Sequence, residues 1–89
     1  MSFGTYTVGT TANLVVSANA NRVSLILFNV GASNAFIGST SALTTANGIM
    51  LSTGSNFTED SGGEKLYQGD VYIISTSSSD IRYWERTRR

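Results

Sequence analysis

The sequence predicts a single all-β domain: one antiparallel β-sandwich of jelly-roll-like topology with about eight or nine short strands. Helix signals are nearly absent, because no window of about 12 residues combines i, i+3, i+4 spacing of apolar residues with freedom from Gly and from clustered β-branched residues. Short runs rich in Val, Ile, Thr, Phe and Tyr recur instead. Each run is bounded by Gly, Asn, Asp or Ser, which favour turns, and such regular spacing is typical of a sandwich or small barrel.

The elements follow in order from this alternation of β-rich runs and turn residues. The predicted strands are 4–8, 13–17, 23–30, 35–37, 49–52, 56–59, 64–68, 71–75 and 80–84. The predicted turns are 9–11, 18–21, 31–33, 39–48, 61–63, 69–70 and 76–79. Alternation within the strands predicts a core that includes Leu25, Leu27, Ile37, Leu51, Phe57, Ile73 and Ile81. The whole chain, 1–89, is one domain, with flexibility expected at 1–5 and 86–89.

Two of the predicted strands, 23–30 and 71–74, are apolar on both faces. A strand that is buried on both sides lies in the middle of a structure. In a sandwich one face of each sheet packs on the core, so a second apolar face favours a subunit interface. The alternative is that a loop of the same chain, such as 39–48, covers this face.

Composition limits both the means of stabilisation and the available chemistry. The chain has 89 residues and no Cys, so neither disulfides nor thiolate zinc sites can support its small core. Charged residues make up only 13% of the sequence, whereas there are 13 Ser and 11 Thr. A small core without disulfides or a zinc site favours association with a partner or with other copies of the chain.

The apolar strand and its flanking residues also carry a resemblance. The run Asn21-Arg22, an apolar strand, Asn29-Val30-Gly31, Phe36-Ile37-Gly38 and Asn47-Gly48-Ile49-Met50-Leu51 resembles a pattern in small all-β virion proteins of tailed bacteriophages. It is most similar to the head decoration (cement) proteins, over roughly residues 21–81. The resemblance implies a structural role on the outer surface of the capsid, with the major capsid protein as partner, and a homo-oligomer, most often a trimer.

A search for chemistry argues against an enzyme. His and Cys are both absent, which removes the commonest general base, the thiol nucleophiles and the usual transition-metal ligands. The one acidic cluster, Glu59, Asp60 and Glu64, flanks a Ser-Gly-Gly turn, so solvated turn residues are expected there. A calcium ion held by these carboxylates is the alternative. We expect no catalytic residues and no cofactor.

The two ends of the chain provide the interface candidates. These are Phe3, Tyr6, Tyr83, Trp84, Arg86, Arg88 and Arg89. Aromatic side chains anchor protein interfaces, and arginine can form paired hydrogen bonds with carboxylates. The basic and aromatic C-terminus also suits nucleic acid, but a net charge of zero argues against that partner.

No membrane partner is expected, because the longest unbroken apolar run is Leu25-Ile26-Leu27-Phe28. Met1–Val8 lacks the features of a signal peptide, so synthesis in the host cytoplasm is expected. Two function classes therefore remain beside the enzyme. One is capsid decoration; the other is a different virion β-module (tail, fibre or head–tail component) or a receptor- or carbohydrate-binding module.

Overall fold

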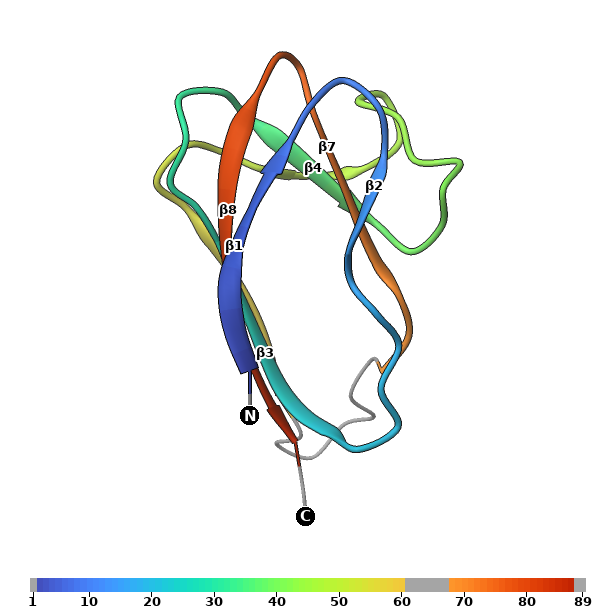
Figure 1. The fold of residues 1–89 in the computed structure, drawn as a ribbon. Coiled ribbons are helices and arrows are strands. Elements are labelled where there is room, and N and C mark those ends of the chain that lie inside the picture. Colours follow the sequence, from blue (N-terminus) through green and yellow to red (C-terminus); the bar gives the residue numbers. More distant parts are fainter. Residues whose placement is uncertain (1, 61–67, 88–89) are drawn as a thin grey trace.

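The computed structural model describes residues 2–60 and 68–87, which form two four-stranded antiparallel sheets packed face to face (Figure 1). No helix occurs in this part of the chain. The strands are β1 (Ser2–Val8), β2 (Asn13–Val16), β3 (Arg22–Asn29), β4 (Ala35–Gly38), β5 (Ile49–Leu51), β6 (Asn56–Asp60), β7 (Val71–Ser75) and β8 (Ser79–Thr87). The all-β fold class predicted from the sequence is confirmed.

The strand order is that of a jelly roll. The first sheet has the order β1-β8-β3-β6 and the second has the order β2-β7-β4-β5. In pairing terms, β1 joins β8, β2 joins β7, β3 joins β6 and β4 joins β5, as if one long hairpin had been rolled up. The two apolar strands that the sequence placed in the middle, β3 and β7, are interior strands of their sheets.

The core lies between the two sheets. Its buried side chains are Val8, Val15, Val16, Leu25, Leu27, Ala35, Ile37, Leu51, Val71, Ile73 and Ile81. Every residue predicted for the core is among them except Phe57, which is half-buried and packs against this cluster. Alternation along each strand was therefore sufficient to identify the inner face.

The last strand is longer than predicted. The sequence ended it at Trp84, because five polar or charged residues follow. In the structure β8 continues to Thr87, with Arg86 opposite Ser24 and Thr87 opposite Arg22. The extension is possible because Glu85 is buried against a positive charge and keeps the strand's inward and outward alternation.

The two ends for which flexibility was expected contain paired residues. Ser2–Thr5 lie in β1, with Phe3 opposite Trp84 and Thr5 opposite Arg82. Arg86 and Thr87 pair with β3, as described above. The predicted strand 64–68 falls almost entirely outside the described residues, and so do Arg88 and Arg89.

Candidate interaction surface

The outer face of the β1-β8-β3-β6 sheet carries a row of apolar side chains across three strands. Phe3 on β1 lies opposite Trp84 on β8, and Trp84 lies opposite Ile26 on β3. Residues that are directly opposite on neighbouring strands point to the same face of a sheet. Phe28 lies two residues further along β3 and therefore on this face as well. We call these four residues, Phe3, Ile26, Phe28 and Trp84, the aromatic face.

The aromatic face is largely open to solvent. Phe3 is 73% exposed, Trp84 is 45% exposed and Phe28 is 43% exposed, while Ile26 is half-buried between its neighbours. The rings of Phe3 and Trp84 stack, with centroids 5.9 Å apart and planes inclined by 29°. The two stacked rings therefore form one continuous apolar surface, which we call the platform.

Tyr6 and Tyr83 lie on the opposite side of the sheet from this platform. Tyr83 packs against the hydrophobic core, because it follows the buried Ile81 by two residues. Tyr6 lies opposite Ile81 on the inner face, but it sits on an edge strand and is 36% exposed. The structure therefore separates Tyr83 from Trp84, although the two are adjacent in the sequence.

Of the predicted arginines, the structure describes Arg86 only. Arg86 is exposed and lies two residues from Trp84, so it borders the aromatic face. Arg82 borders it on the other side, opposite Thr5 and Phe28. The described part of the C-terminus thus presents Trp84 between two exposed arginines, Arg82 and Arg86.

Sequence reasoning did not name Ile26 and Phe28 as interface candidates, although the signal was present. It lay in the two apolar faces of the strand 23–30, for which a covering loop at 39–48 was the alternative. That alternative is wrong for β3, because the segment 39–48 joins β4 and β5 of the other sheet and lies by the inner-facing Leu25. Phe28 remains exposed.

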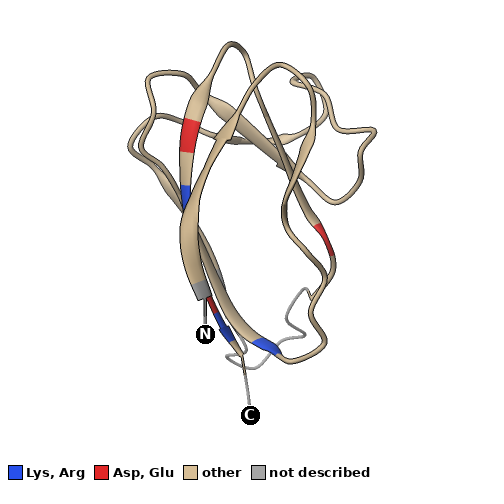
Figure 2. Ribbon diagram, viewed as in Figure 1, with Lys and Arg blue, Asp and Glu red and all other residues tan. Residues whose placement is uncertain are grey.

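Charge is sparse over the described ribbon (Figure 2). Near the aromatic face, Asp80 accepts a hydrogen bond of 2.9 Å from the hydroxyl of Thr7. β1 itself contains no charged residue. A partner would therefore meet mostly hydroxyl and apolar groups on this sheet, with Arg82 and Arg86 as local cations.

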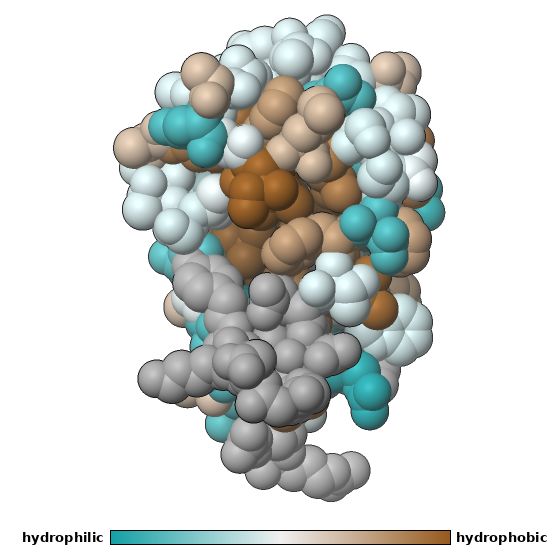
Figure 3. Space-filling model, turned by 180° about the vertical axis from the view of Figure 1, so that it is seen from behind, coloured by the Kyte–Doolittle hydropathy of each residue, from teal (hydrophilic) through white to brown (hydrophobic). Residues whose placement is uncertain are grey.

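A second apolar feature opens between the sheets on the side away from β1 and β2. It is a pocket of about 600 Å³. Its lining residues include Leu25, Ile37, Leu43, Phe57 and Val71, with Ser39, Thr40 and Asn47 as polar members. Figure 3 shows apolar side chains gathered at the centre of this side. The pocket contains no acid or base among these residues, so it is suited to apolar contact.

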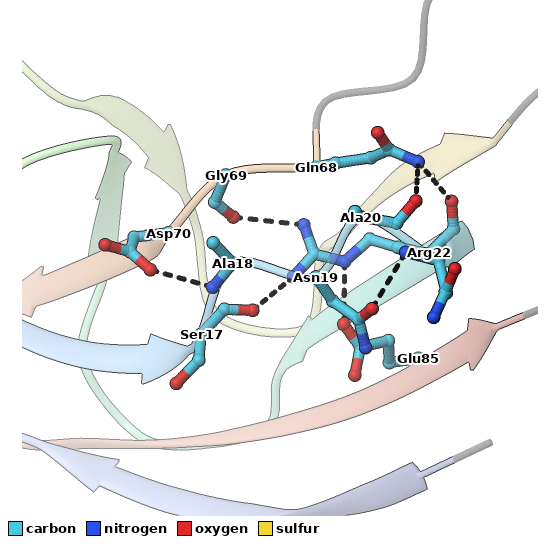
Figure 4. Close-up of polar contacts among 10 residues, drawn as sticks. Ser17, Ala18, Asn19, Ala20, Arg22, Gln68, Gly69, Asp70 and Glu85 are labelled. Atoms are coloured by element: carbon cyan, nitrogen blue, oxygen red, sulfur yellow. Dashed lines mark hydrogen bonds and ion pairs between the residues drawn. The ribbon is translucent and has the colours of Figure 1, made fainter.

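One end of the sandwich is closed by a buried arginine at the start of β3 (Figure 4). The Nε of Arg22 donates to Glu85 at 2.7 Å, and its two terminal nitrogens donate to the carbonyl groups of Gly69 at 3.1 Å and Ser17 at 2.7 Å. Arg22 is fully buried, and the side chain of Glu85 is 11% exposed. Because Ser17 and Gly69 flank strands of the second sheet, this group joins the two sheets.

The other end of the sandwich is closed by a buried asparagine at the end of β3. The amide nitrogen of Asn29 donates to the carbonyl groups of Ser33 at 2.9 Å and Leu51 at 2.8 Å. Its amide oxygen accepts from the backbone of Gly31 at 3.1 Å and from the hydroxyl of Ser79 at 2.5 Å. This group again joins the two sheets, since Leu51 ends β5.

Neither of these buried groups resembles a reaction centre. All polar side-chain atoms that are buried in the described part of the chain have a hydrogen-bond partner. Among the same residues, no group of three or more acidic, His or Cys residues is placed to hold a metal ion. The side chains of Glu59, Asp60 and Glu64, where calcium was the alternative, lie outside the described part. In residues 2–60 and 68–87 no helix is long and apolar enough to cross a membrane.

Comparison with known proteins adds no relative: no protein family, no curated protein and no solved structure matches this chain.

Proposed function

We propose that this protein is a non-enzymatic structural component of a tailed-bacteriophage virion, which decorates the capsid and stabilises it by clamping neighbouring subunits of the major capsid protein. It is made in the host cytoplasm and sits on the outer surface of the assembled head. The resemblance of residues 21–81 to head decoration proteins supports this role.

The fold supports this proposal in a general way. Jelly rolls of eight strands are frequent in viral capsid and lectin domains. Because one fold can serve many functions, the strand order is compatible with the proposed function but does not distinguish it from other functions of jelly rolls. The surface must therefore carry the argument.

The single observation that carries the proposal is the exposed aromatic face. Phe3, Phe28 and Trp84 are each more than two-fifths exposed on one side of one sheet. Exposed apolar side chains gathered on one face in this way mark a candidate interaction site. Tryptophan and arginine are also the residues that most often dominate binding energy, and Trp84 lies between Arg82 and Arg86 along β8.

The mechanism requires binding and no reaction. A protein that binds the mature capsid better than its unassembled subunits stabilises the capsid by mass action. Each copy contributes a modest interface, and many copies on one particle add to a large resistance against internal pressure. Because the four residues of the aromatic face lie on paired strands, their backbone is already ordered before binding.

The copy number in purified virions tests the proposal most directly. A decoration protein is present in hundreds of copies per particle, whereas a fibre or head–tail component is present in tens. Quantitative gel analysis of purified particles therefore separates the two, and absence from particles contradicts both.

A binding assay then tests the surface. Trp84→Ala should weaken binding to undecorated heads by about thirtyfold, which corresponds to roughly 2 kcal/mol. The matched control is Leu14→Ala, since Leu14 is 39% exposed on the other sheet. Equal affinities of both variants and the parent protein would remove the aromatic face from the proposal.

The stacked pair of Phe3 and Trp84 also favours a second candidate, a receptor- or carbohydrate-binding module of the virion. Aromatic faces stack on the apolar faces of sugar rings, and the hydroxyl of Thr5 and the guanidinium of Arg82 lie in the next row of the sheet. Titration with soluble glycans, followed by Trp84 fluorescence, tests this candidate. A saturable response that is lost in Phe3→Ala would favour it over capsid binding.

A further inference from the structure

The four edge strands of the two sheets differ in how well they are protected against pairing with another chain. These edges are β1 and β6 in one sheet and β2 and β5 in the other. An unprotected edge presents free backbone N–H and C=O groups and invites a further strand. Proteins normally guard such edges with short strands, bulges, prolines or charges.

Three of the four edges carry one of these protections. β5 has only three residues. β2 has four residues and an irregular register between Leu14 and Val16. β6 ends with two consecutive acidic residues in its sequence, Glu59-Asp60, which disfavour pairing between identical strands.

β1 carries none of them. It is seven residues long, with the sequence Ser-Phe-Gly-Thr-Tyr-Thr-Val and no charge or proline. Its register against β8 is regular from Ser2 to Val8, without a bulge. Within the described residues its other side is paired with no strand.

From this we propose that β1 pairs with β1 of a second copy of the chain, antiparallel about a two-fold axis at Thr5, so that two β1-β8-β3-β6 sheets become one continuous eight-stranded sheet. The inference is independent of the capsid proposal. It differs from the trimer that the resemblance implied, because antiparallel pairing of identical strands closes on itself with two copies.

The sequence of β1 is self-complementary in this arrangement. With Thr5 opposite Thr5 of the second copy, Phe3 lies opposite Thr7 and Gly4 lies opposite Tyr6. Each of these unlike pairs sets a large residue against a smaller one, so no two rings compete for the same place. On the outer face the two aromatic faces are thereby joined through Phe3, Thr5 and Thr7 of both copies.

Gly4 gives this pairing its space on the inner face. A Cβ atom at this position would lie 3.1 Å from the hydroxyl oxygen of Tyr83 and 3.2 Å from the ring carbon that carries it. Tyr83 thus already covers Gly4 from the β8 side. In the dimer Tyr6 of the second copy covers it from the other side, and aromatic residues across from an edge glycine are known to stabilise strand pairs.

The oligomeric state of the full chain is the first test. We expect sedimentation equilibrium at micromolar concentrations to show a monomer–dimer equilibrium. A monomer throughout this range, or a trimer, would overturn the inference.

Charge substitution at the two-fold axis is the second and sharper test. Thr5→Lys and Thr5→Glu each place two like charges opposite one another, so each should raise the dimer dissociation constant by at least about tenfold. An equal mixture of the two variants should restore dimers, because the charges are then opposite. Thr58→Lys makes the same change on the exposed face of β6 and should leave dimerisation unchanged. Failure of the mixture to restore dimers, or equal loss in Thr58→Lys, would contradict pairing through β1.

A cross-link gives the geometry independently. The chain has no cysteine, so Thr5→Cys introduces the only thiol. Directly opposite residues in antiparallel strands lie within disulfide distance. Mild oxidation should therefore convert Thr5→Cys into a covalent dimer, whereas Thr58→Cys should remain monomeric on a non-reducing gel. Equal cross-linking of both variants would overturn the inference.

Discussion

The two ends of β3 meet the same structural problem with different chemistry. At each end, loops cross from one sheet to the other and turn backbone carbonyl groups toward the interior. Arg22 satisfies the carbonyls of Ser17 and Gly69 at the first end, and Asn29 satisfies those of Ser33 and Leu51 at the second. Both residues are 0% exposed.

The difference lies in what each end must bind. At the first end Arg22 donates to two carbonyls and to the Glu85 carboxylate, and a guanidinium supplies donors without accepting. The second end also presents donors, from the backbone of Gly31 and the hydroxyl of Ser79. An amide can donate and accept, so Asn29 suits that end without a charge. The choice between ionic and neutral closure therefore follows from the local balance of donors and acceptors.

The largest effect on stability is expected from removing Arg22. We call the end of the sandwich that Arg22 closes with Glu85 the ionic end. Arg22→Met removes the guanidinium and leaves the largely buried Glu85 carboxylate without it, which should lower the free energy of unfolding by about 3–5 kcal/mol. Urea unfolding followed by Trp84 fluorescence measures this loss. For a small domain such a loss is a large fraction of the total stability.

Two further variants show whether charge or geometry is responsible. Arg22→Lys keeps the charge but cannot reach three acceptors in the fixed directions of a guanidinium, so it should recover only part of the loss. The double variant Arg22→Met with Glu85→Leu removes both charges and should be more stable than Arg22→Met alone. If the double variant is the less stable of the two, Glu85 is not the main source of the loss.

Asn29 closes the other end of the sandwich without a charge, and we call this the neutral end. Removing Asn29 should lower the free energy of unfolding by less than removing Arg22. Asn29→Leu keeps a similar volume but leaves two carbonyls, one N–H and one hydroxyl without their amide partner, and we expect a loss of about 2–4 kcal/mol. Urea unfolding of Asn29→Leu beside Arg22→Met under the same conditions measures the two losses. A loss larger than that of Arg22→Met would reverse the ranking.

The sequence predicted the fold class and the core well, because both depend on alternation within short strands. It read Asn29 and Gly31 only as parts of a strand end and a turn. The partnership of Arg22 with Glu85 spans 63 positions of the chain and depends on the strand order, which local patterns do not contain. One signal was available: Arg22 is one of only six basic residues and begins the most apolar strand of the chain.

The candidate surface was predicted in part for the same reason. Phe3 and Trp84 were named as interface candidates near the ends of the chain, but their stacking depends on the register of β1 against β8. Tyr83 was named as a candidate beside Trp84, since both are aromatic residues of the C-terminal segment. The predicted strand 80–84 already contained both residues, and since adjacent residues in a strand point to opposite faces, alternation along that strand could have separated them.

Crowding at the neutral end gives a smaller effect. A Cβ atom on Gly31 would collide with the Oγ of Ser79 and with the backbone nitrogen of Asp80, so either the turn or the start of β8 must shift. Gly31→Ala should therefore lower stability by about 1–3 kcal/mol. Gly9→Ala is the matched control, because its Cβ would approach only one backbone oxygen at 4.0 Å. Equal losses in both variants would point to a general effect of removing glycine.

The smallest effect is expected from Gln68, which hydrogen-bonds to the backbone at the ionic end. The side-chain amide of Gln68 donates to the carbonyl groups of Ala20 at 2.9 Å and Arg22 at 3.0 Å. These two bonds hold the backbone from which the Arg22 side chain extends. Because Gln68 is only half-buried, water can replace part of these bonds, and Gln68→Ala should cost about 0.5–1.5 kcal/mol. Gln68→Glu keeps the shape but has no N–H to donate, so it should lose at least as much. If Gln68→Glu were as stable as the parent protein in urea unfolding, these two hydrogen bonds would contribute nothing to the stability of this end.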